Sequence, residues 1–158
     1  MSELKGKNKE ILAYTAGIVD GEGCIGVGRN SRNNRTYFIR ILVANTDVLL
    51  LEWLKQQWGG DIALRKHKNH QNWKPYRCWR ISHRRALDFL RQIRPYLIIK
   101  QAQADLALQM PSLKKYRSLR IPTQGIPPGS CLSDDSLHEL EFLKQQMHKL
   151  NQKGVTIQ

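Results

Sequence analysis

The feature that most constrains the fold of this chain is a helical segment, predicted over residues 8–19, whose two faces differ sharply in size. Asn8 can cap its N-terminus, and one face repeats at the three- and four-residue spacing of a helix through Ile11, Leu12, Thr15, Ile18 and Val19. The other face is almost bare, and consists of Ala13, Ala16, Gly17 and Asp20. Because glycine inside a helix costs up to about 1 kcal/mol relative to alanine, the sequence favours close approach of a second helix at Gly17.

Two acidic residues set among glycines follow this helix, in the order Asp20, Gly21, Glu22, Gly23. A helix C-terminus carries partial negative charge, so carboxylates are poorly placed there unless a cation joins them. The small face and the acidic end together predict two such helices side by side, with a metal ion at their ends.

Residues 15–23, which read Thr-Ala-Gly-Ile-Val-Asp-Gly-Glu-Gly, resemble the signature of the LAGLIDADG homing endonucleases. The resemblance covers about the first 110 residues, and it includes the spacing of the later elements. In that family the last acidic residue of the motif binds the catalytic divalent metal, which implies this role for Glu22, although aspartate is commoner there. The motif occurs once, so the resemblance is to the single-motif, homodimeric type, which is often intron-encoded.

Hydrophobic periodicity predicts an alternating order of helices and hairpins. Strands are expected at 24–30, 36–43, 61–68 and 74–82, and helices at 8–19, from 45 or 46 to 58, at 84–93, 96–110 and 133–151. In the second strand, Tyr37, Ile39, Ile41 and Val43 form the buried face. The predicted fold class is therefore α+β, with the order αββαββα and an antiparallel sheet. The resemblance implies that residues 1–110 are a core of homing-endonuclease type and that the sheet binds DNA. Residues 111–158 should form a proline-containing connection and a C-terminal helix packed on the same domain.

The chain is strongly basic, with a net charge of +13 that arises from 26 Lys and Arg against 13 Asp and Glu. Such an excess favours a polyanionic partner, nucleic acid first, although a merely basic protein would share it. No apolar run of about 18 residues and no apolar N-terminal segment occurs, so we expect neither a membrane partner nor secretion. The odd set Cys24, Cys78 and Cys131 favours a reducing, intracellular compartment, such as a bacterial or archaeal cytoplasm or an organelle matrix.

Basic side chains concentrate on the sheet face that the helices leave free, and in the hairpin turns. An exposed basic residue is usually only solvated, but a two-stranded ribbon fits the major groove, where Arg recognises guanine and Asn recognises adenine. Turn residues would mostly neutralise phosphates. The residues expected to contact double-stranded DNA are Arg29, Asn30, Arg32, Arg35, Thr36, Phe38, Arg40, Arg65, Lys66, His67, Lys68, Arg77 and Arg80.

Hydrolysis of a phosphodiester bond needs an activated water, and charge neutralisation that bound metal ions supply. Glu22 and the backbone carbonyl of Gly21 offer oxygen ligands suited to Mg²⁺. The resemblance further implies Lys100 near the scissile phosphate and Asn45 as a polar residue that orients water. A second basic residue of the pocket is not evident, because three leucines occupy 49–51.

One motif, one sheet and two DNA strands predict a homodimer, with Ala13, Ala16, Gly17 and Asp20 at its interface. Asp20 would cap the helix end or meet the partner helix. The predicted function is a sequence-specific double-strand homing endonuclease that acts on a long pseudo-palindromic site. The alternative is a non-catalytic nucleic-acid-binding protein of the same fold, either an RNA maturase or a DNA-binding regulator.

A second motif, the G-x-G-x-x-G pattern at 21–26, is that of dinucleotide-binding turns. Its context is wrong, because a predicted helix precedes it and a predicted strand follows, which leaves no helix N-terminus for a pyrophosphate. We therefore expect no nucleotide cofactor.

Overall fold

The computed structural model describes residues 7–30, 36–65, 75–110 and 134–152, without the side chains of 29, 30, 36 and 134–136. The elements are α1 (Lys9–Glu22), β1 (Gly23–Asn30), β2 (Thr36–Asn45), α2 (Val48–Trp58), β3 (Asp61–Arg65), β4 (Tyr76–Ser82), α3 (His83–Ile93), η1 (Arg94–Tyr96), α4 (Gln101–Gln109) and α6 (Asp134–Leu150). This order confirms the predicted α+β class and the αββαββα core.

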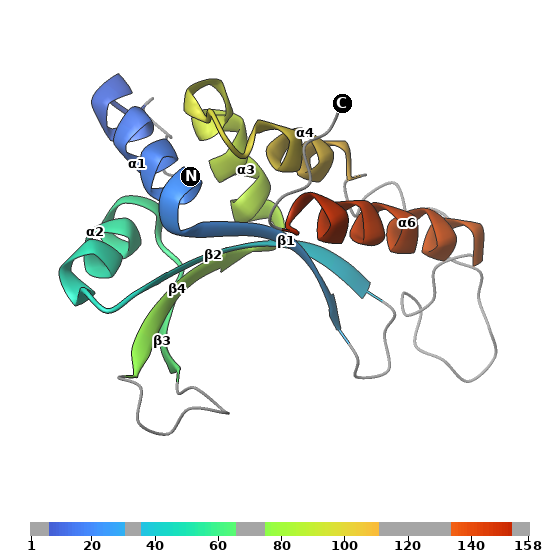
Figure 1. Cartoon of the computed structure of the whole chain (residues 1–158), viewed down its shortest axis with the longest axis horizontal. Coiled ribbons are helices and arrows are strands. Elements are labelled where there is room, and N and C mark those ends of the chain that lie inside the picture. Colours follow the sequence, from blue (N-terminus) through green and yellow to red (C-terminus); the bar gives the residue numbers. More distant parts are fainter. Residues whose placement is uncertain (1–6, 31–35, 66–74, 111–133, 153–158) are drawn as a thin grey trace, which may run out of the picture.

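The four strands form one antiparallel sheet in the order β1-β2-β4-β3. Figure 1 shows the sheet curved, with the helices gathered over its convex side and the concave side left open. The predicted inner face of β2 is confirmed, because Tyr37, Ile39, Ile41 and Val43 are all buried. Alternation along a strand therefore directs every second β2 side chain to the open face.

The centre of the core lies between β4 and the helices. Trp79 is fully buried, its indole N–H donates to the carbonyl oxygen of Gly59 at 2.8 Å, and its ring packs against Phe89. Gly59 and Gly60 both have positive φ and end α2, as predicted. At Gly60 a Cβ atom would lie 2.4 Å from the carbonyl oxygen of Arg80, so only glycine fits this turn.

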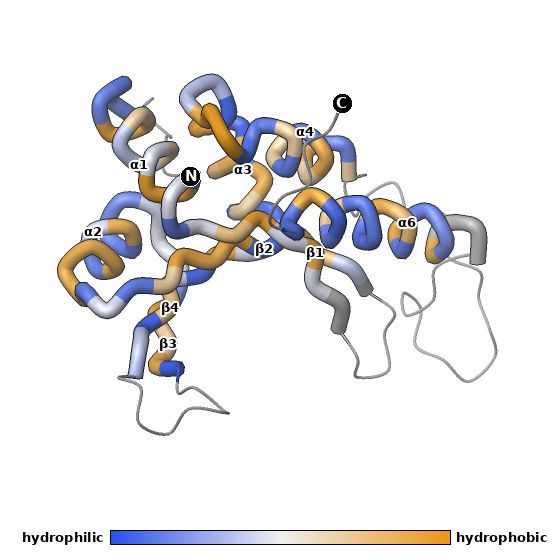
Figure 2. Tube along the Cα trace, in the orientation of Figure 1, coloured by the Kyte–Doolittle hydropathy of each residue, from blue (hydrophilic) through white to orange (hydrophobic). Residues whose placement is uncertain are grey.

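The C-terminal helix α6 lies against β1 and α4. Hydrophobic and hydrophilic positions alternate along it in Figure 2, and its inner side buries Leu140 and Met147. Its end is tied to the core by the Asn151 amide, which donates to the carbonyl oxygen of Ile25 at 2.8 Å. No helix in the described ranges is both long enough and apolar enough to span a bilayer.

Some predicted boundaries were wrong. Helix α1 continues to Glu22, and α2 begins at Val48 because the Asp47 carboxylate caps it, accepting the N–H of Leu49 at 2.9 Å. Leu49 of α2 is 80% exposed. The single helix expected at 96–110 is instead η1, a non-helical stretch and α4. Residues 111–133, which contain the predicted connection, lie outside the described residues.

Candidate active site and nucleic-acid interface

The C-terminus of α1 is held by Lys100. Its ammonium donates to the carbonyl oxygen of Val19 at 2.9 Å and also to that of Asp20. The last carbonyl groups of a helix lack partners within the helix, and a cation there also meets the negative end of the helix dipole. Lys100 therefore stabilises the helix end that carries Glu22.

The carboxylate of Asp20, in α1, in turn binds the backbone of the segment that carries Lys100. It accepts the backbone N–H of Ile98 at 2.7 Å and that of Lys100 at 2.9 Å. These two bonds explain why 97–100 is not helical, because its N–H groups are directed at α1. Asp20 is thus occupied within its own chain, in a role close to the predicted capping of the helix end.

Partial burial lowers the pKa of Lys100, while the neighbouring Asp20, Cys24 and Glu22 act in the opposite direction. A half-buried ammonium is less stable than one in water, and a nearby anion stabilises it. A phosphate group at this point would have that effect, and it is the partner that the family resemblance implies for Lys100.

Glu22 lies exposed in the last turn of α1, with Gly21 beside it. Carboxylate and backbone carbonyl oxygens suit a hard cation such as Mg²⁺ in kind. These two ligands are too few to complete a metal site. Within the described ranges, no group of three His, Cys, Asp or Glu residues could hold a metal. One chain thus offers a fitting but partial set of ligands.

Asn45 ends β2 at the same end of the sheet as Glu22, since Val43, two residues earlier, faces Gly23 at the start of β1. Its side-chain oxygen accepts the N–H of Asp47 at 2.8 Å. The Asn45 oxygen thus shapes the entry to α2, and its amide nitrogen is the group that could donate to water.

The predicted small face of α1 is only partly exposed. Ala16 is fully buried in the core of its own chain, so its assignment to the dimer interface was wrong. Ala13 and Gly17 are exposed, and Gly21 continues their row at four-residue spacing. A Cβ atom at Gly17 or Gly21 would meet nothing within 4 Å. This exposed row, Ala13, Gly17 and Gly21, is called the small row of α1 below.

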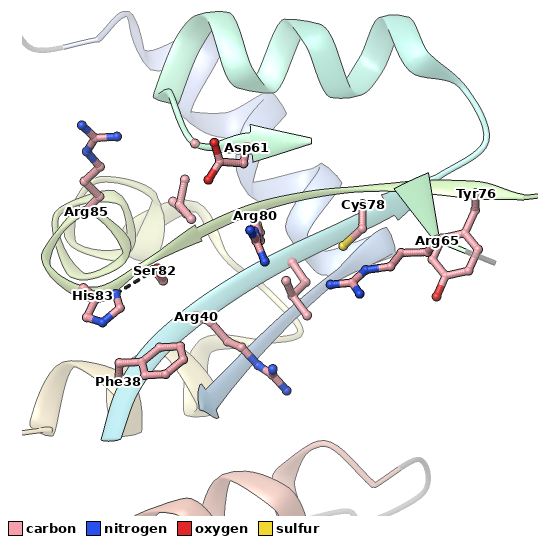
Figure 3. A pocket seen from close by; sticks show the side chains of 13 residues that line it. Phe38, Arg40, Asp61, Arg65, Tyr76, Cys78, Arg80, Ser82, His83 and Arg85 are labelled. Carbon is pink, nitrogen blue, oxygen red and sulfur yellow. Dashed lines mark hydrogen bonds between the residues drawn. The ribbon is translucent and has the colours of Figure 1, made fainter. Parts of the chain in front are cut away.

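The open face of the sheet holds a groove of about 760 Å³ (Figure 3). Four arginines line it: Arg40, Arg65, Arg80 and Arg85. Among its described lining residues, Asp61 is the one acidic side chain. The sequence predicted the first three arginines on this face, whereas Arg85 was missed, although it belongs to a basic run at 83–85 that forms the first turn of α3. The groove has the charge expected of a surface that binds a polyanion.

Residues of β1 make room for the side chains of β2 on this face. Gly26 and Gly28 face Arg40 and Phe38 in the strand register. A Cβ atom at Gly28 would lie 2.5 Å from the Phe38 ring, whereas one at Gly26 would lie 3.8 Å from Nε of Arg40. Gly28 thus lets the Phe38 ring extend across β1, whereas a Cβ atom at Gly26 would make only an ordinary contact with Arg40.

Not all predicted DNA contacts lie on this face. Arg77 alternates with Cys78 and shares its side of β4 with the buried Trp79 and Ile81, so the strand directs it away from the groove. Arg29, Asn30 and Thr36 lie in β1 and β2, but their side chains are not described. The remaining predicted contacts lie outside the described residues: Arg32, Arg35, Lys66, His67 and Lys68.

No family model and no curated protein matches the chain. Solved structures do match. They include the homing endonuclease I-CvuI in complex with the I-CreI target (TM-score 0.66, 23% identity, covering 94% of this chain and 87% of that one). The archaeal intron-encoded homing endonuclease I-Vdi141I, complexed with DNA, matches with a TM-score of 0.68 and 15% identity, over 96% of this chain and 91% of that one.

A third match is the I-SmaMI LAGLIDADG homing endonuclease bound to cleaved DNA, with a TM-score of 0.63 and 16% identity. It covers 96% of this chain but 48% of I-SmaMI, so this chain spans about half the length of that protein. With the antiparallel sheet, the helices on its convex side and α1 ending at Glu22, these matches give the conclusion that the chain has the fold of the LAGLIDADG homing endonucleases.

Proposed function

We propose that this chain is a sequence-specific double-strand DNA endonuclease that acts as a homodimer with Mg²⁺. The observation that carries the proposal is the position of Glu22, an exposed carboxylate in the helix turn that the Lys100 ammonium holds through the Asp20 carbonyl, at one end of a sheet whose open face is lined by arginines. A metal-binding carboxylate, a nearby cation and a polyanion-binding surface are parts that metal-dependent phosphodiester hydrolysis needs in one place.

DNA binding is assigned to the arginine-lined groove. Arg40, Arg65 and Arg80 project from adjacent strands, in the arrangement by which a β-ribbon reaches base edges in the major groove. The solved proteins with this fold support the assignment, because I-CvuI and I-Vdi141I are in complex with DNA and I-SmaMI is bound to cleaved DNA.

Catalysis is assigned to Glu22, Gly21, Lys100 and Asn45. Glu22 and the Gly21 carbonyl would hold Mg²⁺, which when bound neutralises phosphate charge and activates water. The I-CvuI complexes were obtained with 2 mM Mg or 2 mM Ca, which supports a divalent ion. Lys100 places its positive charge at the end of α1 that carries Glu22, where it would attract a phosphate, and Asn45 would donate to water through its amide nitrogen.

Homodimerisation is assigned to the small row of α1. Side chains are nearly absent there, so a second α1 could approach closely along Ala13, Gly17 and Gly21 and bring a second Glu22 to the same place. The match to about half of I-SmaMI supports this assembly, because two copies of this chain would equal one of that protein. A two-fold dimer would prefer a pseudo-palindromic site.

The proposal is tested by selection for cleavage. The protein is incubated with a library of randomised DNA duplexes in Mg²⁺ or in EDTA, and the new ends are sequenced. We expect one family of pseudo-palindromic duplexes cut in both strands, in Mg²⁺ alone, and two chains per duplex in sedimentation. Enrichment of bound duplexes without cleavage at any Mg²⁺ concentration would instead indicate the non-catalytic alternative.

A further inference from the structure

His83 has an unusual backbone conformation at the junction of β4 and α3. Its φ is 60°, in the left-handed region, and it is the one residue other than glycine with positive φ in the described part of the chain. This conformation costs free energy for a residue with a side chain, and it persists only where the surroundings hold it.

The imidazole ring of His83 stacks on the ring of Phe38. The ring centroids are 4.6 Å apart and the planes differ by 8°. Nδ1 of His83 lies 2.9 Å from the Ser82 hydroxyl, which leaves Nε2 as the ring nitrogen for an outside partner. Both rings line the groove, and Figure 3 shows them together at one end of it, near Arg40.

The position of Phe38 is fixed from the other side by Gly28. A single methyl group at Gly28 would enter the Phe38 ring, at 2.5 Å from Cζ. Three elements thus contribute to one layer on the open face: Gly28 from β1, Phe38 from β2 and His83 from the start of α3. His83 itself is exposed, so its ring is not part of the core.

We infer that Phe38 and His83 form a base-reading pair, and that His83 is a specificity-determining residue. This inference rests on the proposed DNA binding. A phenylalanine ring in the major groove can contact the methyl group of thymine, and an imidazole nitrogen can form a hydrogen bond with an adjacent base edge. The Phe38 ring contacts the thymine methyl group, and Nε2 of His83 forms a hydrogen bond with the neighbouring base.

The experiment first selects, in EDTA, the duplexes that the wild-type chain binds from a randomised library. In the enriched site, each thymine is then replaced by deoxyuridine, which lacks only the methyl group. We expect one position per half-site where this change weakens wild-type binding about fourfold, the factor expected for one buried methyl group. No such position would overturn the assignment of Phe38.

The selection is repeated with His83→Gly, Gly28→Ala and the matched control Gly26→Ala. Glycine adopts φ 60° freely, so His83→Gly should fold with a thermal midpoint at least equal to that of wild type, yet lose the base preference next to the thymine. Gly28→Ala should displace Phe38 and lose the preference for thymine, whereas Gly26→Ala should keep both preferences.

If His83→Gly keeps the wild-type base preferences, the inference is overturned. If its thermal midpoint also falls, the stack of His83 on Phe38 has a purely structural role. If His83→Gly does not fold, the test rests on Gly28→Ala. Wild-type base preferences in Gly28→Ala would also contradict the proposed pair of Phe38 and His83. Failure of the wild-type chain to enrich any duplex is a different result, because it removes the proposed function together with this inference.

Discussion

Asp20 and Lys100 are joined twice, although 80 positions separate them in the chain. The Asp20 carboxylate accepts the backbone N–H of Lys100 at 2.9 Å, and the Lys100 ammonium donates to the backbone carbonyl of Asp20. Each residue therefore uses its side chain to bind the backbone of the other. The end of α1, with Glu22 two residues on, is fixed by this reciprocal pair.

Replacing Asp20 by alanine should destabilise the fold. The N–H groups of Ile98 and Lys100 would both lose their acceptor, at a cost of about 1–3 kcal/mol in the free energy of unfolding. The measurement is urea denaturation of the variant and of Asp88→Ala, whose carboxylate meets exposed arginines. The control should change by less than about 1 kcal/mol, and equal losses in both variants would contradict the role of Asp20.

The lowered pKa of Lys100 predicts a pH dependence of stability. Burial makes the folded chain release this proton more readily than the unfolded chain, so the unfolded state binds more protons in the alkaline range below the ordinary lysine pKa of about 10.4. The free energy of unfolding of the wild type, minus that of Lys100→Met, should therefore rise as pH increases toward that value. A difference that falls with pH would have the wrong sign for a buried ammonium.

Enlarging Gly17 should separate dimerisation from folding. The Cβ atom of a methionine there meets nothing within 4 Å in its own chain, and the change removes a helix glycine, so the dilute monomer should become more stable by up to about 1 kcal/mol. Its side chain would nevertheless hold two α1 helices apart. Sedimentation velocity should show a monomer for Gly17→Met and a dimer for wild type and for Gln56→Met, a control on the exposed side of α2. A dimeric Gly17→Met would exclude the small row as the interface.

Asn45 offers a way to separate a structural from a catalytic role. Aspartate keeps the oxygen that accepts the N–H of Asp47 but has no amide nitrogen. Asn45→Asp should thus keep wild-type stability while it lowers the cleavage rate, and Asn45→Ala should lose about 1 kcal/mol as well. Thermal melts and single-turnover cleavage measure the two effects, and full activity of Asn45→Asp would remove Asn45 from the catalytic group.

Much of the sheet could be predicted because its signal is local. Tyr37, Ile39, Ile41 and Val43 alternate with polar or partly exposed residues, and this period alone specifies which face is buried. The arginines on the opposite face follow from the same alternation. Asn8 as the cap of α1 is also a local signal, and its oxygen accepts the N–H of Glu10 at 3.3 Å.

The errors arise where distant residues decide the conformation. Residues 97–100 have a helical pattern, but the Asp20 carboxylate takes two of their N–H groups. His83 has a left-handed backbone that the local pattern does not predict, and its ring stacks on Phe38 of β2. Ala16 belongs to the small face by spacing alone, yet the packing of its own chain buries it.

The most direct measurement of the central claim compares Glu22→Gln with wild type on the duplex obtained by the selection for cleavage. The change removes one negative charge and keeps the size of the side chain. Glu52→Gln, on the exposed face of α2, is the matched control. We predict that Glu22→Gln binds the duplex with wild-type affinity and cuts neither strand in Mg²⁺, while Glu52→Gln cuts both. Cleavage by Glu22→Gln at the wild-type rate would contradict the assignment of this carboxylate to the metal.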